Sequence, residues 1–165
     1  MQLEEKNQNK SKTIMIIAGE ASGDMHGASL VHEMLKIDSS LNFYGIGGNK
    51  LQEAGVKLLA HASEMAVVGL TEVIPKLGNI LRIMNRMKKS MDEFNPDLVI
   101  LIDYPDFNLR IAKAARKRGI KVFYYISPQV CAWRKGRINQ IKKSVNKMAV
   151  ILPLKLKHTD RKVSR

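Results

Sequence analysis

The sequence predicts an α/β protein built on a doubly wound, Rossmann-like parallel sheet. Short apolar runs that end in Gly, Asp or Pro alternate with longer segments of helical period, which is typical of βαβ units. The runs are rich in Ile and Val and lack polar alternation, as expected for strands covered by helices on both faces. A length of 165 residues suits one domain with a sizeable core.

The elements follow from these runs in order along the chain. We expect parallel strands at residues 13–18, 42–46, 56–60, 97–102, 121–126 and 147–152. We expect helices at residues 27–37, 49–54, 75–94, 109–118 and 135–145. Right-handed crossovers place the ligand crevice beyond the carboxyl ends of the strands. The chemistry is therefore expected in three loops that follow strands, at residues 19–27, 103–108 and 127–134.

The domain is expected to span residues 13–153. Residues 1–12 are polar and charged and are expected to form a disordered leader, and residues 154–165 a frayed basic tail. The sequence shows neither an apolar secretory signal nor a run of about 18 apolar residues that could span a membrane. A single cysteine, Cys131, excludes an intrachain disulfide and a multi-cysteine metal site. We expect no cofactor.

The charge is distributed unevenly. The chain carries a net charge of +13, with 28 Lys and Arg against 15 Asp and Glu, but residues 1–108 carry more acids than bases. All of the excess positive charge therefore lies beyond residue 108. Such asymmetry indicates an anionic partner, which could be nucleic acid, a phosphorylated substrate or an anionic lipid surface.

The first loop contains Glu20, Ser22 and Asp24. Small residues permit a tight turn there, and Ser22 or Asp24 could cap the next helix. A helix N-terminus also favours anions, so a phosphate or sugar phosphate could bind at this position. The turn does not require Glu20, which makes this carboxylate a candidate for ligand contact.

The second loop follows the most apolar strand with Asp103, Pro105, Asp106 and Asn108. A carboxylate at the end of a buried strand is partly desolvated, which raises its basicity and suits proton abstraction. Asp103 is therefore a candidate general base. The alternative is that one of these side chains caps the helix that begins near Leu109, and Asn108 is the better placed for that role.

The third loop combines Trp133 with the basic residues Arg134, Lys135 and Arg137. Stacking of a sugar or base and contact with a phosphate are both possible, and so is a plain core role for Trp133. Cys131 is a poor candidate for a nucleophile, because no histidine has a visible claim to partner it.

The helix expected at residues 75–94 has one apolar stripe of core spacing and further apolar positions outside it. Extra apolar residues beside cationic ones are what a membrane-surface helix requires. The candidates for membrane contact in and before this helix are Leu70, Val73, Ile74, Leu77, Ile80 and Leu81. Ile83 is a further apolar position beyond the stripe.

Five segments together resemble the lipid-A-disaccharide synthases in order and spacing, over residues 12–153. They are residues 19–24 (Gly-Glu-Ala-Ser-Gly-Asp), 45–48 (Gly-Ile-Gly-Gly), 65–73 (Met-Ala-Val-Val-Gly, then Glu-Val), 102–108 (Ile-Asp-Tyr-Pro-Asp-Phe-Asn) and 125–133 (Tyr-Ile-Ser-Pro-Gln-Val-Cys-Ala-Trp). The resemblance implies an inverting glycosyltransferase of GT-B type, with two Rossmann-like domains and no metal. This chain resembles the N-terminal half, and residues 154–165 are expected to lie outside the family pattern.

The resemblance also implies the reaction and the partners. Members join UDP-2,3-diacylglucosamine to 2,3-diacylglucosamine 1-phosphate, giving lipid A disaccharide 1-phosphate and UDP in lipopolysaccharide biosynthesis. Asp103 would be the general base, and Glu20 and Ser22 would shape the acceptor side, with Asp24, Asp106, Asn108 and Trp133 as further substrate-binding candidates. The enzyme would be peripheral on the cytoplasmic face of the inner membrane of a Gram-negative bacterium.

Two departures from the family shape the expectation. Members are about twice as long, so the second, C-terminal domain with most of the UDP-sugar site is missing from this chain, and the chain alone is expected to be inactive. Cys131 stands where members usually have Trp. The alternative function is a non-catalytic basic α/β module that binds anionic membrane or nucleic acid. The basic segment beyond residue 108 lacks the interleaved aromatic residues of proteins that bind single strands, so no specific nucleic acid partner is expected.

Overall fold

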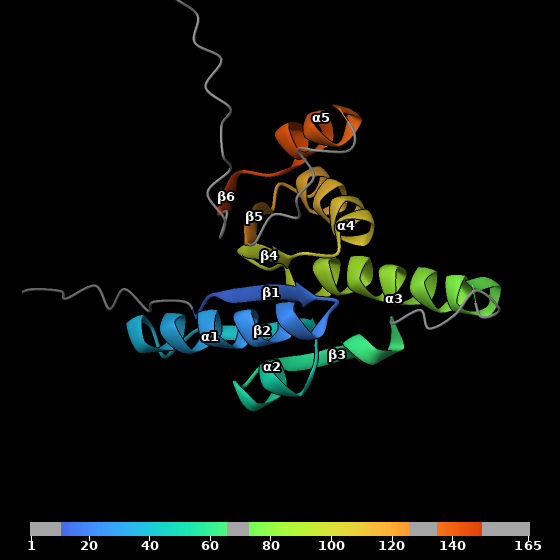
Figure 1. Ribbon diagram of the computed structural model, residues 1–165. Coiled ribbons are helices and arrows are strands. Elements are labelled where there is room, and N and C mark those ends of the chain that lie inside the picture. Colours follow the sequence, from blue (N-terminus) through green and yellow to red (C-terminus); the bar gives the residue numbers. More distant parts are fainter. Residues whose placement is uncertain (1–10, 66–72, 126–134, 150–165) are drawn as a thin grey trace, which may run out of the picture.

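The structure is a computed structural model that describes residues 11–65, 73–125 and 135–149, with only the backbone described for residues 73–77 and 135–139. Its centre is a six-stranded parallel sheet in the order β3-β2-β1-β4-β5-β6. Figure 1 shows the strands stacked from β3 at the bottom to β6 at the top. The fold class that the sequence predicts, a Rossmann-like doubly wound sheet, is confirmed.

The strands lie where the apolar runs predict them, to within a residue or two. They are β1 Thr13–Ala18, β2 Asn42–Gly47, β3 Lys57–His61, β4 Leu98–Ile102, β5 Lys121–Tyr125 and β6 Lys147–Ala149. The predicted end of the last strand, at residues 150–152, lies outside the described residues, as do most of the predicted leader and the predicted tail.

Each face of the sheet has its own core. On β4, Val99 and Leu101 pack into one cluster, and Ile100 and Ile102 pack into the other. Alternate residues of the same strand are therefore buried on opposite faces, which explains the absence of polar alternation in the sequence. Helix α1 (Ala21–Ile37) covers one face together with α2 (Asn49–Glu53), and α3 (Val73–Phe94) covers the other with α4 (Pro105–Lys117).

The remaining helical elements are short. A 3-10 turn, η1 (Ala62–Glu64), follows β3, and α5 (Lys135–Ser144) connects β5 to β6. In Figure 1, α5 lies above α4 at the β6 side of the sheet.

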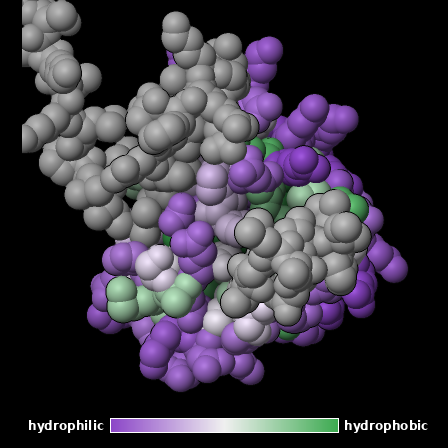
Figure 2. All heavy atoms as spheres, turned by 45° about the vertical axis from the view of Figure 1, so that its right-hand side comes forward, coloured by the Kyte–Doolittle hydropathy of each residue, from purple (hydrophilic) through white to green (hydrophobic). Residues whose placement is uncertain are grey.

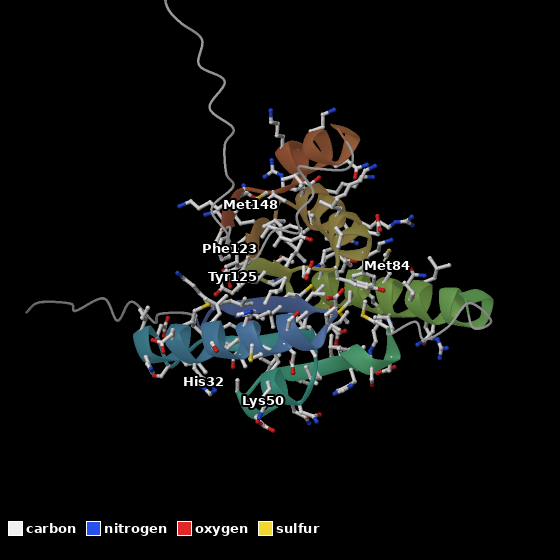
Figure 3. The ribbon with its side chains drawn as sticks, viewed as in Figure 1. His32, Lys50, Met84, Phe123, Tyr125 and Met148 are labelled. Atoms are coloured by element: carbon white, nitrogen blue, oxygen red, sulfur yellow. The ribbon has the colours of Figure 1, made fainter. Side chains whose placement is uncertain are left out.

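The core beneath α3 is rich in methionine. Met15 of β1, Met65 after η1, and Met84, Met87 and Met91 of α3 are all at most 4% exposed. Met84 is labelled on α3 in Figure 3. Thioether side chains are flexible and fill irregular gaps, so this face of the sheet is packed by adaptable side chains.

Two helices begin four or more residues earlier than the sequence predicts. Helix α1 begins at Ala21 rather than at residue 27, and α4 begins at Pro105 rather than at residue 109. The first two of the three expected loops are therefore tight turns, each followed by the first turns of a helix. Ser22 and Asp24 lie inside α1, so the prediction that one of them caps this helix is wrong.

Candidate functional site

The turns after β1 and β4 meet at the carboxyl edge of the sheet. The two strands are neighbours, and Ala18 at the end of β1 is in register with Ile102 at the end of β4. Helix α1 leaves toward one face and α4 toward the other, so the direction of winding reverses between these strands. Open α/β sheets bind their ligands at such a switch point. The candidate site therefore lies here, as the sequence predicts.

Asp103 directly follows β4 at this edge of the sheet, and its backbone conformation is unusual. Asp103 has φ 48° and Tyr104 has φ 42°, so two consecutive non-glycine residues adopt the left-handed conformation. This conformation disfavours residues that carry a Cβ, and it persists only where the surroundings enforce it. Asp103 is half-buried, because it directly follows four buried residues of β4.

Two donors hold this turn through the same oxygen atom. The amide Nδ2 of Asn108 donates to the carbonyl of Asp103 at 2.7 Å, and the hydroxyl of Tyr124 donates to it at 2.6 Å. Nδ2 of Asn108 also donates to the carbonyl of Ile102 at 3.1 Å. Residues of α4 and β5 thus fix the peptide that follows the candidate base.

Asn108 is neither the helix cap nor the substrate-binding residue that the sequence suggests. Tyr104 occupies the N-cap position of α4, and Asn108 lies inside the helix with no exposed surface. Its amide is directed at backbone carbonyls, so it cannot reach a ligand in the crevice. We reassign Asn108 to holding the Asp103 turn.

Tyr104 is a site residue that the sequence reasoning missed. Its half-buried ring lies against Gly19 of the first turn, where an added Cβ would come within 2.8 Å of Cγ of the ring. Burial raises the pKa of the Tyr104 phenol, and the negative charges of Glu20 and Asp106 raise it further. The signal was present in the sequence as an aromatic residue between two acids in the second loop.

The carboxylates around this phenol come from both turns. Glu20 is exposed at the N-cap position of α1 and makes no capping hydrogen bond, in agreement with the expectation that the turn does not require it. Ser22 is exposed in the first turn of α1, and Asp106 is exposed in the first turn of α4. The two turns therefore bring the carboxylates of Glu20, Asp103 and Asp106 to this edge of the sheet, together with the phenol of Tyr104 and the hydroxyl of Ser22.

Asp24 has a structural role that is clear from its contacts. It is 6% exposed, and its carboxylate accepts hydrogen bonds from the backbone N–H groups of Gly48 (2.6 Å), Lys50 (3.0 Å) and Leu51 (3.1 Å). A side chain of α1 thus caps the N-terminus of α2, whose own N-cap residue is glycine. The Asp24 carboxylate is therefore occupied by the backbone N–H groups at the start of α2.

Several predicted contacts cannot be placed. Trp133 and Cys131, the rest of the third loop and Leu70 lie outside the described residues, and the side chains of Val73, Ile74 and Leu77 are not described. The described part of α3 gives a mixed result. Leu81 is 46% exposed, Ile80 packs partly against the core, and Ile83, expected outside the core stripe, is buried in it at 4% exposure.

Two further observations concern the described residues alone. No helix among them is long and apolar enough to cross a membrane. They also contain no group of three or more His, Cys, Asp or Glu side chains that could hold a metal ion.

The fold defines the class of protein. The sheet and its helices match a UDP-N-acetylglucosamine 2-epimerase with a TM-score of 0.60 at 14% identity, covering 86% of this chain and 42% of that one. They match MurG of Acinetobacter baumannii with a TM-score of 0.58 at 15% identity, covering 87% and 42%. The chain therefore has the Rossmann-like fold of one domain of GT-B glycosyltransferases and epimerases.

The family follows from the sequence comparison. A family model described as lipid-A-disaccharide synthetase matches residues 14–162, so the chain belongs to this family. The lipid-A-disaccharide synthase of Syntrophus aciditrophicus is 64% identical over 143 residues, which are 87% of this chain and 37% of the relative. That of Geobacter sulfurreducens is 52% identical over 154 residues, which are 93% and 40%.

The extent of these matches adds two facts. The chain spans about 40% of the length of the curated relatives. The matched range ends at residue 162 and so includes most of the segment from residue 154 that we expected to lie outside the family.

Proposed function

We propose that this chain forms the acceptor-side domain of a lipid-A-disaccharide synthase, with Asp103 as the general base. The observation that carries the proposal is the geometry of the switch point, where β4 delivers a half-buried carboxylate beside the first turn. Membership of the family supplies the reaction class. None of the comparisons supports the alternative of a non-catalytic basic module.

The proposed step transfers a glucosamine unit between two lipid-linked sugars. Asp103 takes the proton from the 6-hydroxyl of 2,3-diacylglucosamine 1-phosphate as that oxygen attacks the anomeric carbon of UDP-2,3-diacylglucosamine. A new glycosidic bond forms with inversion, the bond from the anomeric carbon to the phosphate oxygen breaks, and UDP leaves with the electron pair. A carboxylate within hydrogen-bond reach of the hydroxyl is required for the proton transfer.

The other groups of the crevice would bind the acceptor. The carboxylate of Glu20 can accept hydrogen bonds from sugar hydroxyls, and the hydroxyl of Ser22 can donate or accept them, since both side chains are exposed in the turn after β1 and the start of α1. Neither α1 nor α4 has a side chain capping its N-terminus, so backbone N–H groups at the start of α1 are available to the 1-phosphate.

The test measures disaccharide and UDP formation from the two lipid precursors. It compares this chain alone with the chain joined to the residues that follow the matched segment in the Syntrophus aciditrophicus relative, which should restore the rest of the donor site. Asp103→Asn should lower kcat by about 10²–10⁴-fold, the usual contribution of a general base. The control is Asp38→Asn, because Asp38 follows the far end of α1 and should leave kcat unchanged.

Two results would contradict the proposal. Wild-type kcat in Asp103→Asn would exclude this carboxylate as the base. Absence of product from the joined protein, when the intact relative is active under the same conditions, would exclude the activity.

We propose in addition that the protein works on the cytoplasmic face of the inner membrane, with α3 at the lipid surface. The described face of α3 supports this, because exposed Leu81 stands beside exposed Arg82, Arg86 and Lys89. Apolar and cationic side chains side by side suit an interface with anionic lipid. In the view of Figure 2, scattered hydrophobic side chains lie among predominantly hydrophilic ones.

Vesicle sedimentation tests this second proposal. Binding to vesicles that contain anionic phospholipid should fall in Leu81→Asp, because a carboxylate is repelled by the surface and must be desolvated there. Met25→Asp is the matched control, since Met25 is 55% exposed but lies on α1. Equal loss in both variants, or no loss in Leu81→Asp, would exclude α3 as the contact.

A further inference from the structure

We infer that Asn108 and Tyr124 are positioning residues for the reaction, because they hold the carbonyl of Asp103 and so fix the orientation of its carboxylate at the switch point. This inference rests on the proposed function, in which Asp103 is the base. Neither residue reaches the crevice itself: Asn108 and Tyr124 both have 0% exposure.

The two donors approach one oxygen from different elements. In the sheet, Tyr124 of β5 is in register with Leu101 of β4, and its hydroxyl reaches past the end of β4 to the carbonyl of Asp103. Asn108 reaches the same oxygen from the first turns of α4, five residues along the chain. A carbonyl held at 2.6 and 2.7 Å by two separate elements has little freedom to rotate.

The conformation of the turn requires such a clamp. The left-handed φ values of Asp103 and Tyr104 are unfavourable for residues with a Cβ, so without external bonds the turn would relax toward a right-handed or extended backbone. Relaxation would rotate the peptide plane and move the Asp103 side chain with it. The orientation of the carboxylate is thus enforced by α4 and β5 together, and not by the two residues of the turn.

The side chain of Asn108 is a poor choice for packing alone, which indicates that its hydrogen bond to the carbonyl of Asp103 is what it contributes. Its Oδ1 is buried without a hydrogen-bond partner, although buried polar atoms are nearly always paired. A leucine would fill a similar volume without leaving an unpaired acceptor. The amide is therefore suboptimal for packing, and within the described part of the chain it bonds only through Nδ2, to the carbonyls of Ile102 and Asp103.

The first experiment asks whether the donors hold the turn. NMR measures the backbone φ of Asp103 and Tyr104, through three-bond couplings and Cβ shifts, in wild type, Tyr124→Phe and Asn108→Leu. Each lost bond should lower the ratio of left-handed to relaxed turn by about tenfold, the equivalent of one buried hydrogen bond. Tyr124→Phe removes one hydroxyl and is the milder change, so it tests the inference even if Asn108→Leu fails to fold.

A matched control separates positioning from general stability. Tyr44 is another buried tyrosine, 4% exposed, whose hydroxyl donates to a backbone carbonyl, that of Ser90 at 3.4 Å. Tyr44→Phe removes the same group from the same kind of site without touching the Asp103 turn. It should leave both φ values and kcat unchanged, whatever it does to the free energy of unfolding.

The second experiment measures kinetics in the joined protein. Tyr124→Phe should lower kcat by about tenfold while KM changes by less than about twofold, because a displaced base affects the chemical step more than substrate binding. Left-handed φ values and a wild-type kcat in Tyr124→Phe would overturn the inference. If Asp103→Asn is fully active, the proposed function fails instead, and the NMR result still decides whether the clamp exists.

Discussion

The buried carboxylate of Asp24 provides a sharp test of how this fold is held together. In Asp24→Ala the backbone N–H groups of Gly48, Lys50 and Leu51 lose their acceptor at the start of α2. Water cannot readily replace it, since Asp24 is 6% exposed and Gly48 and Leu51 are buried. The contact also connects α1 to α2 at the carboxyl end of β2, so its loss should weaken the packing of both helices on this face of the sheet.

The magnitude follows from the bonds that are lost. Removal of an N-cap side chain costs about 0.5–2 kcal/mol, and a buried donor left without a partner costs about 1–3 kcal/mol. Because the lost bonds share one acceptor they are not additive, and we expect about 3 kcal/mol for Asp24→Ala. For a chain of this size that is a fall in Tm of about 6–12 °C. Asp24→Asn keeps one oxygen acceptor and should lose about half as much.

Urea unfolding followed by circular dichroism measures these differences. The control is Asp38→Ala, because Asp38 also accepts a backbone bond, from Ser40 at 3.0 Å, but in an exposed turn. It should show a much smaller loss. If Asp24→Ala unfolds at the same urea concentration as wild type, the capping of α2 by α1 contributes nothing to stability and the reasoning is refuted.

Three further outcomes are expected. Burial raises the pKa of Tyr44 to about 12; the unfolded chain loses this proton near pH 10, so between about pH 10 and 12 the unfolded state binds fewer protons and stability falls. Urea unfolding at about pH 9 and pH 11.5 should show a smaller fall in Tyr44→Phe than in wild type. Gly45→Ala should abolish folding, because the new Cβ would lie 1.9 Å from the carbonyl oxygen of Ile16. Gly55 is also at positive φ but has open space around it, so Gly55→Ala should yield a folded protein by circular dichroism. Hydrogen bonding to Arg118 lowers the pKa of Asp92, and Arg118→Gln should return that pKa to its ordinary value in a carboxyl NMR titration; an unchanged value would exclude the ion pair in solution.

The strands could be predicted from the sequence because burial on both faces leaves a simple signature. Every predicted strand lies within a residue or two of an observed one over the described residues. The position of Asp103 at the end of β4 and of Glu20 at the end of β1 followed from the same signature. The strands of a parallel sheet end at the same edge, and this alone brings both carboxylates together.

The helix starts could not be predicted so well, because small residues were interpreted as a loop. Gly23 and Gly27 lie inside α1, where added Cβ atoms would come within 3.2 and 2.9 Å of the Ile102 side chain. They allow α1 to pack closely on β4. Their place inside the helix is therefore explained by contact with Ile102, which is far away in the sequence. For α4 the signal was local and was missed, since Pro105 occupies a position at the helix start where its missing N–H has no cost.

The role of Asn108 needed information that no local pattern contains. An asparagine near a helix start predicts a cap, and the choice between capping and bonding backward to the strand depends on the left-handed turn at Asp103. That turn is held in part by Tyr124, which lies on another strand. Local sequence therefore located the site but not the means by which it is kept in shape.

The oxidation rates of the buried methionines under α3 can report how often this helix separates from the sheet. Peroxide converts a thioether to a sulfoxide only when solvent reaches the sulfur, so Met84, Met87 and Met91 are protected while α3 stays in contact with the sheet. Met25 and Met148, at 55% and 40% exposure, set the rate for accessible sulfur in the same chain. The ratio of the two rates, obtained by mass spectrometry of peptides, reports how often this helix lifts away from the sheet.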